Sequence, residues 1–483
     1  MREHILFLTG KLAEKRLHAV LESMRDKNFS YEIKNIGVSV AALMTAGMIG
    51  RRLEAINGAD RVILPGLCRG DLASLSTQLG VPVIRGSDDL KDLPVFFGRE
   101  QKPVDLSKHN VLIFAEIVDA AEISIDEIVE RAHRYVEDGA DVIDIGCLPD
   151  TDFSHLEEVV AVLKSEGHRV SVDSMDSDEL LRGGKAGADY LLSLKESTLW
   201  IANEVDAIPV LIPEHHPEID SLYRAMDKLS EQGLPFIADS ILDPIHFGFT
   251  ESIIRYSKMR ESYPTCAIMM GIGNLTELTE ADTSGINAML FGIISELGIN
   301  NVLATQVSPH ACSALREADK ARRMFYAAKQ QGSLPKGIDS ALLTTHARKP
   351  FPYSASEITE LAGEIKDPSY RIQISEEGIH VYNRDGISTA DDPFTLFPEL
   401  KSVQDDAAHA FYMGVELARA QIALRLGKRY VQDEELDWGA AVRKLDDGVR
   451  SNSQTAHDIK NSETYKSAGS TLKASKKKRQ TRP

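Results

Sequence analysis

Short apolar runs alternate with amphipathic segments over the first 105 residues. Strand-like runs at Ile5–Thr9, Arg61–Leu64 and Val81–Ile84 are separated by helical patterns, of which Lys11–Asp26 is the first. Apolar strands that alternate with amphipathic helices indicate parallel β-α-β units. We therefore expect residues 1–105 to form a small parallel α/β domain.

Eight further strand-like runs follow Pro103, with helical patterns such as Ile125–Glu137 between them. Eight apolar strands with intervening helices over about 220 residues are typical of a (β/α)8 TIM barrel. An open, doubly wound sheet is the alternative. In a barrel, the residues at the carboxyl ends of the strands carry the chemistry. The runs are Val111–Ile117, Val142–Ile145, Val170–Val172, Tyr190–Leu194, Pro209–Ile212, Pro235–Ala238, Ala267–Met270 and Asn301–Ala304.

A third pattern begins near residue 340. Tyr370–Ile374, Gly378–Asn383 and the turn that follows indicate a small antiparallel sheet, and Ala407–Leu426 has apolar residues at helical spacing. This region is predicted to be an α+β domain. The last residues are basic and poor in apolar groups, which predicts a disordered tail or, alternatively, an arm for a nucleic acid or another acidic partner. The expected segments are 1–105 (α/β), 106–340 (barrel), 341–447 (α+β) and 448–483 (tail).

The composition narrows the classes of function. The chain has 483 residues, a net charge of −18 and 43% hydrophobic residues. These values predict a folded cytoplasmic protein and argue against nonspecific nucleic-acid binding. No apolar run reaches about 18 residues, so no membrane-spanning helix is expected, and no signal peptide is expected either, because the apolar stretch Ile5–Leu8 is short for one. The four cysteines lack the spacing of a metal site: Cys68, Cys147, Cys266 and Cys312.

Polar side chains follow several strands of the predicted barrel. Asp173, Asp243 and Asn274 stand at or shortly after strand ends, so a barrel brings them to one mouth. An ionised carboxylate accepts two parallel N–H bonds, which suits a heteroaromatic ring with adjacent donors. For each aspartate alone, a helix cap or a structural ion pair is the alternative. Arg69, in a glycine-rich loop of the first domain, and Lys195 are candidate phosphate ligands; a plain strand-to-helix turn is the alternative for the loop of Arg69.

Four segments of the predicted barrel resemble a known family. Gly139–Gly146, Val170–Ser174, Gly187–Tyr190 and Leu242–Phe249 are similar, in order and spacing, to the motifs of the dihydropteroate synthase superfamily. Its members are (β/α)8 barrels that bind a pterin in the barrel mouth. The resemblance therefore implies a pterin site in this chain.

The flanking regions are similar to those of dihydropteroate synthase-related proteins of archaea and methylotrophic bacteria. Ala408–Gly414 and Tyr430–Asp433 look like the C-terminal domain of these proteins, and the first 105 residues are expected to be Rossmann- or flavodoxin-like. In those organisms such proteins are associated with tetrahydromethanopterin, a pterin carrier of one-carbon units.

The resemblance also implies roles for residues at the barrel mouth. Asp173 and Asp243 would hold the amino-pyrimidine edge of the pterin. The remaining pterin-binding candidates are Ser193, Gly271 and Asn274. Asn274 stands where pterin-dependent methyltransferases of the same superfamily have an Asn that hydrogen-bonds the pterin.

Several motifs of the synthases are missing. The Asn that ends their first barrel strand and helps to hold magnesium and diphosphate is absent; Glu116 and Asp119 stand near its place, as metal ligands or as surface acids. Their Gly-Glu-Ser-Thr-Arg-Pro motif reads Cys147–Asp150 here, and their Ser-Arg-Lys is replaced at Gly273-Asn274. No residue is therefore assigned to a metal, although magnesium is compatible with the reaction.

Three functions stay open at this point. The resemblance implies a transferase of tetrahydromethanopterin synthesis that joins a dihydropterin-methyl diphosphate to a ribosylated aminobenzene phosphate. The alternative is a pterin-binding protein that is not a synthase, either a pterin-dependent methyltransferase or a carrier-binding scaffold. A barrel with only a structural role is the third. The expected partners are the pterin, a phosphorylated arylamine and a second copy of the chain, because barrels of this superfamily often dimerise.

Overall fold

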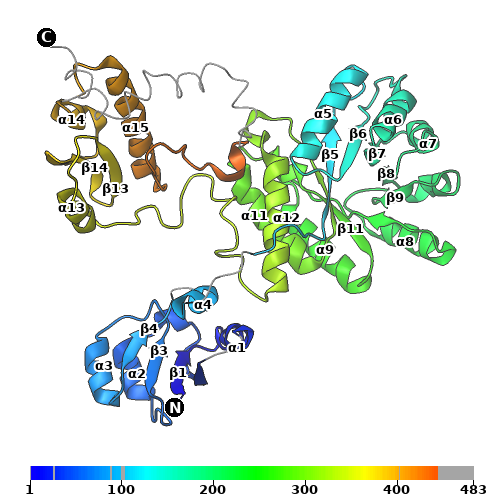
Figure 1. The fold of residues 1–483 in the computed structure, drawn as a ribbon. Helices are drawn as coiled ribbons and strands as arrows, with labels where there is room; N and C mark the ends of the chain where they lie inside the picture. Colours follow the sequence, from blue (N-terminus) through cyan, green and yellow to red (C-terminus); the bar gives the residue numbers. More distant parts are fainter. Residues whose placement is uncertain (1, 25–27, 88–89, 99–103, 402, 444–483) are drawn as a thin grey trace. The chain divides into compact units, whose positions relative to one another are not determined.

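The computed structural model describes residues 2–24, 28–87, 90–98, 104–401 and 403–443 (Figure 1). Its chain forms two compact units. One unit comprises Met1–Leu106 with Ala327–Lys336, and the other comprises Ser107–Tyr326 with Gly337–Pro483. The predicted tail at 448–483 lies outside the described residues. No helix among the described residues is long and apolar enough to cross a membrane.

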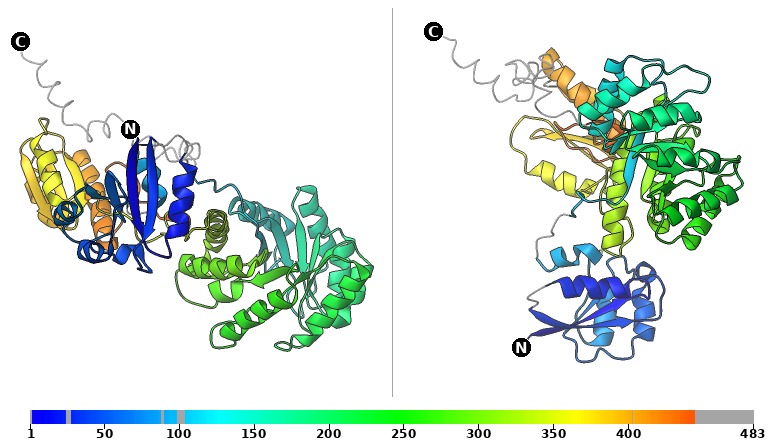
Figure 2. Two further views of the ribbon diagram at one scale, coloured as in Figure 1. Left: turned by 90° about the horizontal axis from the view of Figure 1, so that it is seen from below. Right: turned by 90° about the vertical axis from the view of Figure 1, so that its right-hand side faces the viewer.

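The N-terminal unit contains a four-stranded parallel sheet with the strand order β2-β1-β3-β4. Helices cover both of its faces (Figure 2), because alternate residues of β1 enter two separate cores: Ile5 and Phe7 pack with α1, and Leu6 and Leu8 pack with α2 and α3. The elements are β1 (Glu3–Thr9), α1 (Glu14–Ser23), β2 (Phe29–Asn35), α2 (Ala46–Arg52), β3 (Arg61–Leu64), α3 (Leu72–Leu79), β4 (Val83–Arg85) and α4 (Leu93–Phe96).

Eight parallel strands of the second unit close into a barrel, in the order β10-β11-β12-β5-β6-β7-β8-β9. Closure is made by β12, which pairs with β5 from Asn301↔Leu112 to Ala304↔Ala115. This confirms the (β/α)8 barrel and excludes the open sheet. The strands are β5 (Leu112–Ile117), β6 (Val142–Gly146), β7 (Val170–Asp173), β8 (Tyr190–Leu194), β9 (Ile208–Leu211), β10 (Ile237–Ala238), β11 (Ala267–Gly271) and β12 (Asn301–Ala304).

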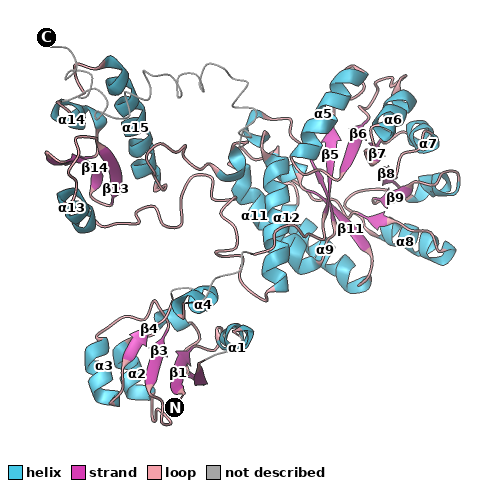
Figure 3. Ribbon diagram, in the orientation of Figure 1, coloured by secondary structure: helices cyan, strands magenta, loops and turns pink. Residues whose placement is uncertain are grey.

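Helices surround these strands (Figure 3). Ser124 caps the start of α5 with a capping box. Its hydroxyl accepts from the Glu127 N–H, and the Glu127 carboxylate accepts from the Ser124 N–H. The helices are α5 (Ile125–Glu137), α6 (Leu156–Ser165), α7 (Ser177–Lys185), the 3-10 helix η3 (Glu196–Asn203), α8 (Asp220–Gln232), α9 (Phe249–Ser262), α10 (Gly273–Thr276), α11 (Thr283–Leu297) and α12 (Ala314–Gln330).

The interior of the barrel is apolar at mid-height. Successive residues of a strand point to opposite faces, so Ile113 and Ile143 pack outward in the core shared with the helices, while alternate residues fill the interior. This interior cluster consists of Phe114, Val142, Leu192, Val210, Ile237 and Met269. A residue two positions further along one of these strands also points into the barrel, and it lies next to this apolar cluster on the side of the carboxyl ends.

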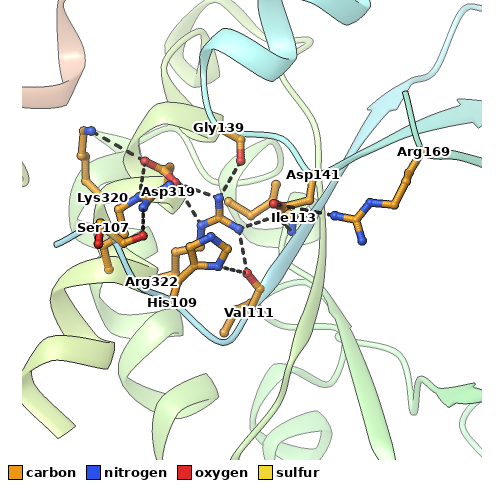
Figure 4. A network of polar contacts seen from close by, with 11 residues as sticks. Ser107, His109, Val111, Ile113, Gly139, Asp141, Arg169, Asp319, Lys320 and Arg322 are labelled. Atoms are coloured by element: carbon orange, nitrogen blue, oxygen red, sulfur yellow. Dashed lines mark hydrogen bonds and ion pairs between the residues drawn. The ribbon is translucent and has the colours of Figure 1, made fainter. Parts of the chain in front are cut away.

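At the opposite end of the barrel, Arg322 of α12 joins the amino ends of β5 and β6 (Figure 4). Its guanidinium, 2% exposed, donates to the Val111 carbonyl at 2.7 Å and the Gly139 carbonyl at 2.9 Å, and it pairs with Asp319 and Asp141. A buried charge is tolerated only when it is paired in this way. These contacts connect α12 to the amino ends of β5 and β6, which form the base of the barrel. The mouth, at the carboxyl ends of the strands, does not contain this ion pair.

A three-stranded antiparallel sheet follows the barrel, in the order β13-β14-β15. Ile372, Ile374 and Val381 pack on α15, while Tyr382 and α13 form a separate cluster. The predicted α+β character is confirmed. The elements are α13 (Ala355–Gly363), β13 (Arg371–Ser375), β14 (Gly378–Asn383), β15 (Gly386–Ala390), α14 (Pro393–Leu396) and α15 (Ala407–Leu426).

Candidate functional site

Four acidic side chains end the inward-facing rows of the barrel. Glu116 lies two residues beyond Phe114 on β5, Asp144 two beyond Val142 on β6, and Asp239 two beyond Ile237 after β10. Asp173 is the last residue of β7. Because side chains of a strand alternate between the two faces, these acids also point into the barrel. They form an acidic layer at its carboxyl end, next to the apolar cluster, where the active sites of TIM barrels lie.

Glu116, Asp144 and Asp173 form a carboxylate cluster. Each offers an oxygen that lies within 4.8 Å of those offered by the other two. The strand register causes this proximity, because Glu116 is the partner of Asp144 and the neighbouring pair is Asp144 and Ser171. The Ser171 hydroxyl donates to Asp144 Oδ1, whereas Asp144 Oδ2 is buried and has no hydrogen-bond partner.

The electrostatics of the carboxylate cluster are unfavourable for ionisation. Burial, and then the charge of Asp173, raise the pKa of Glu116 to about 7. Burial raises the pKa of Asp144 well above its ordinary value, and the charges of Asp173 and Glu116 add to the effect. Burial also raises the pKa of Asp173, against the hydrogen bond from Ser193. The cluster therefore favours a positive or hydrogen-donating ligand.

Ser193 reaches Asp173 through an irregularity in β8. Its hydroxyl donates to Asp173 Oδ1 over 2.5 Å, and its φ of 68° lies in the left-handed region. The pairing of β8 with β9 shifts register between Leu191 and Leu194 at this point. Non-glycine residues rarely adopt such a φ, and strained residues gather at functional sites.

Asp243 is placed differently from Asp173. Its Oδ1 lies 2.7 Å from His216 Nε2, and its Oδ2 accepts from Arg255 at 2.8 Å and from Ser252 at 3.0 Å. Burial would raise the pKa of Asp243, but the hydrogen bonds from Arg255, His216 and Ser252 outweigh it and hold the pKa below its usual range. Asp243 is thus an ionised carboxylate whose charge is balanced within the protein.

The other expected site residues have separate positions. Asn274, in α10, donates from its amide to the Leu242 carbonyl at 2.7 Å, and Gly271 ends β11, where an added Cβ would meet no atom within 4 Å. Lys195 directly follows β8 and is the N-cap residue of η3. Arg69 belongs to the N-terminal unit, where its backbone pairs with Met44 and Ala46.

Sequence reasoning missed Asp239 and the basic partners of Asp243. Asp239 accepts from Tyr256 at 2.6 Å and from the Ile241 N–H at 2.7 Å, and burial raises its pKa to about 6. The available signal was the spacing of two residues after an inward apolar position. No sequence pattern indicated Arg255 or His216, because these residues come close to Asp243 only in the folded chain.

Two parts of the chain match known families. Residues 3–88 match a family of unknown function (DUF6513). Residues 116–211 match the family described as pterin binding enzyme, a stretch that contains the carboxylate cluster, Ser193 and Lys195. The barrel segment is similar to pterin-binding enzymes.

Longer similarities are also found. An uncharacterised protein, MJ0107 of Methanocaldococcus jannaschii, is 26% identical over 535 residues, which cover 90% of this chain and all of that protein. The solved 7,8-dihydropteroate synthase of Vibrio fischeri is 14% identical, with a TM-score of 0.37, over 47% of this chain and 95% of its own. The synthase of Xanthomonas albilineans in complex with 7,8-dihydropteroate is 16% identical, with a TM-score of 0.36, over 47% and 94%.

Proposed function

We propose that this protein is a pterin-binding transferase that joins a dihydropterin-methyl diphosphate to a ribosylated aminobenzene phosphate during synthesis of tetrahydromethanopterin. The observation that carries the proposal is the match of residues 116–211 to pterin-binding enzymes, together with the place of that stretch in the barrel. Its strands β5, β6 and β7 contribute Glu116, Asp144 and Asp173, which are three of the four acidic side chains of the mouth.

The acidic layer suits the pterin ring. The amino-pyrimidine edge of a pterin presents N–H donors, and carboxylates accept such donors in pairs. Asp173 is oriented by the Ser193 hydroxyl, which occupies Oδ1. In this proposal Asp173 accepts one N–H of the ring on a carboxylate lone pair that the Ser193 hydroxyl does not use, Gly271 allows close approach of the ring to the strand, and Asn274 offers its amide oxygen.

The transfer needs a departing diphosphate and an attacking arylamine. The bond between the pterin methylene carbon and the diphosphate oxygen breaks, and the arylamine nitrogen forms the new bond and then releases a proton. The departing charge requires a cation. Lys195, two positions beyond Ser193, is the candidate cation among the residues at the strand ends. The hydrogen bonds from Ser197 lower the pKa of Glu214, and the positive charge of Lys195 makes a smaller contribution in the same direction. Arg69, which belongs to the N-terminal unit, stays a separate candidate for binding a phosphate group within that unit.

Asn274 favours a second function. An Asn at this strand end, with its amide N–H fixed on the Leu242 carbonyl, suits a pterin-binding protein that acts on the complete reduced carrier, as a methyltransferase or as a scaffold. Such a protein has no diphosphate to release, which fits a mouth whose cluster is acidic.

Calorimetry on the full chain separates the two functions. The transferase predicts tighter binding of the dihydropterin-methyl diphosphate than of the reduced carrier, and formation of a condensation product when the phosphorylated arylamine and magnesium are added. Preference for the complete carrier, with no condensation product, contradicts the transferase and supports the second function. Absence of binding to either pterin contradicts both.

A further inference from the structure

We propose that Glu116, Asp144 and Asp173 bind one divalent cation of the magnesium or manganese type. This inference rests on the proposed function for its use, because a cation at the mouth would serve a diphosphate-bearing pterin. It rests on the carboxylate cluster alone for its existence. Glu116 is the residue that creates the cluster, since it adds a third carboxylate to the pair on β6 and β7.

The first observation is the geometry of the oxygens. Oxygens from three separate strands lie within 4.8 Å of one another, which small side-chain adjustments bring to the separation required around a hard cation with ligands at about 2.1 Å. The donor set is made of carboxylates only. Oxygen ligands of this kind suit magnesium and manganese rather than zinc or copper, which prefer nitrogen or sulfur.

The second observation is an unsatisfied atom. Asp144 is fully buried at 0% exposure, and its Oδ2 has no hydrogen-bond partner although its Oδ1 is held by Ser171. A buried carboxylate oxygen without a partner is costly. Within the part of the chain that the structure describes, no lysine, arginine or histidine side chain bonds to any member of the cluster, so a cation from solution is the natural counter-charge.

The surroundings are shaped for this arrangement. A Cβ on Gly146 would come within 2.8 Å of Glu116 Oε1, so only glycine at this position leaves the Glu116 carboxylate in place. Ser171 and Ser193 each fix one oxygen of Asp144 and Asp173 and leave the second oxygen available. The three carboxylates are therefore positioned by neighbours rather than by one another.

Manganese binding to the full chain tests the site directly. Electron paramagnetic resonance and calorimetry with Mn²⁺ alone should report one site per chain, displaced by Mg²⁺. Glu116→Gln should weaken Mn²⁺ binding at least tenfold, about 1.4 kcal/mol. The matched control is Glu122→Gln, which removes an exposed acid from the loop after the same strand and should leave binding unchanged.

A thermal readout keeps the test independent of activity. Without metal, Glu116→Gln should raise the melting temperature because it removes one of three crowded carboxylates, and Mn²⁺ should stabilise the parent chain but not the variant. Equal Mn²⁺ binding by the parent and Glu116→Gln, or no binding at about 1 mM Mn²⁺, would overturn the site.

The two proposals fail in different ways. If Mn²⁺ binds at the cluster but does not tighten binding of the dihydropterin-methyl diphosphate, the cation site stands and the transferase is contradicted. If the condensation proceeds at full rate in the presence of a chelator, the transferase stands and the use of the cation in the transfer is contradicted, while Mn²⁺ binding alone decides whether the site exists.

Discussion

The Ser193 hydroxyl donates a 2.5 Å hydrogen bond to Oδ1 of Asp173 from a backbone with φ of 68°. The left-handed conformation costs about 1–2 kcal/mol for a residue with a Cβ, so what serine contributes at this position is its hydroxyl and not a favourable backbone conformation. The bond stabilises the ionised form of a carboxyl whose pKa is raised by burial. The strained backbone of Ser193 in β8 thus places its hydroxyl where it fixes the Asp173 carboxylate at the mouth of the barrel.

Ser193→Ala and Ser193→Gly should separate the hydroxyl from the backbone. Both remove the bond to Asp173, so both should weaken binding of a pterin by about tenfold, or 1.4 kcal/mol, in calorimetry. Only Ser193→Ala keeps the strained φ, so Ser193→Gly should unfold at higher urea than Ser193→Ala by up to about 1 kcal/mol. A pterin affinity that follows stability across the two variants would contradict a role for the hydroxyl.

Gly146→Ala should displace Glu116. The added methyl group would lie 2.8 Å from Glu116 Oε1 and 3.2 Å from the Ile117 carbonyl oxygen. We expect weaker Mn²⁺ binding, together with a loss of about 1–3 kcal/mol in unfolding free energy from overpacking. In a chain that already carries Glu116→Gln, adding Gly146→Ala should cause no further loss of Mn²⁺ affinity. If the losses of the two variants are additive, Gly146 does not act through Glu116.

Gly271→Ala tests whether the pterin approaches β11. No protein atom lies within 4 Å of the added methyl group, and the backbone is not in the left-handed region. The melting temperature should therefore stay within about 1 °C of the parent chain, while calorimetry should show weaker pterin binding. Unchanged pterin affinity would remove Gly271 from the proposed site.

Asp243→Asn should destabilise the fold, because it leaves the largely buried guanidinium of Arg255, 13% exposed, without its counter-charge. Breaking a buried pair costs about 3–5 kcal/mol. The pKa of Asp243 is lowered in the fold, so its stabilising contribution is complete above its unfolded pKa of about 3.9 and is lost as pH falls through the lower folded pKa.

Urea unfolding at several pH values checks this sign. The difference between the parent chain and Asp243→Asn should be full near neutral pH and should shrink below about pH 4. A difference that stays constant over this range would mean that the carboxylate charge does not stabilise the fold.

The repeating pattern made the barrel predictable. Tyr190–Leu194 and Asn301–Ala304 were predicted with their observed bounds, because buried parallel strands are short apolar runs. Strand β2 was missed, since Phe29–Asn35 pairs only with β1 at the sheet edge and mixes Tyr31 and Ile33 with charged residues. Edge strands carry a weaker apolar signal for this reason.

The site was predictable only in part. Asp173 and Asp243 were found because they stand at or shortly after predicted strands, yet the sequence contains no sign that Arg255 and His216 bond to Asp243 while Asp173 lies in an acidic cluster. Glu116 was recognised only as a departure from a family motif. Its proximity to Asp144 comes from strand register, which a closed barrel fixes and a single run does not.

Arg322→Met should separate the stability of the barrel base from the chemistry of the mouth. The variant would leave Asp141 and the Val111 and Gly139 carbonyls without the guanidinium that binds them, so we expect a loss of about 3–5 kcal/mol in urea unfolding. Lys320→Met is the control: Lys320 Nζ lies 3.6 Å from Asp319 Oδ2 and its side chain is 45% exposed, so the loss should be no more than about 1 kcal/mol. Because Arg322 lies at the amino ends of β5 and β6, Mn²⁺ and pterin affinities of the folded variant should equal those of the parent chain, and a change in either would mean that the base and the mouth are coupled.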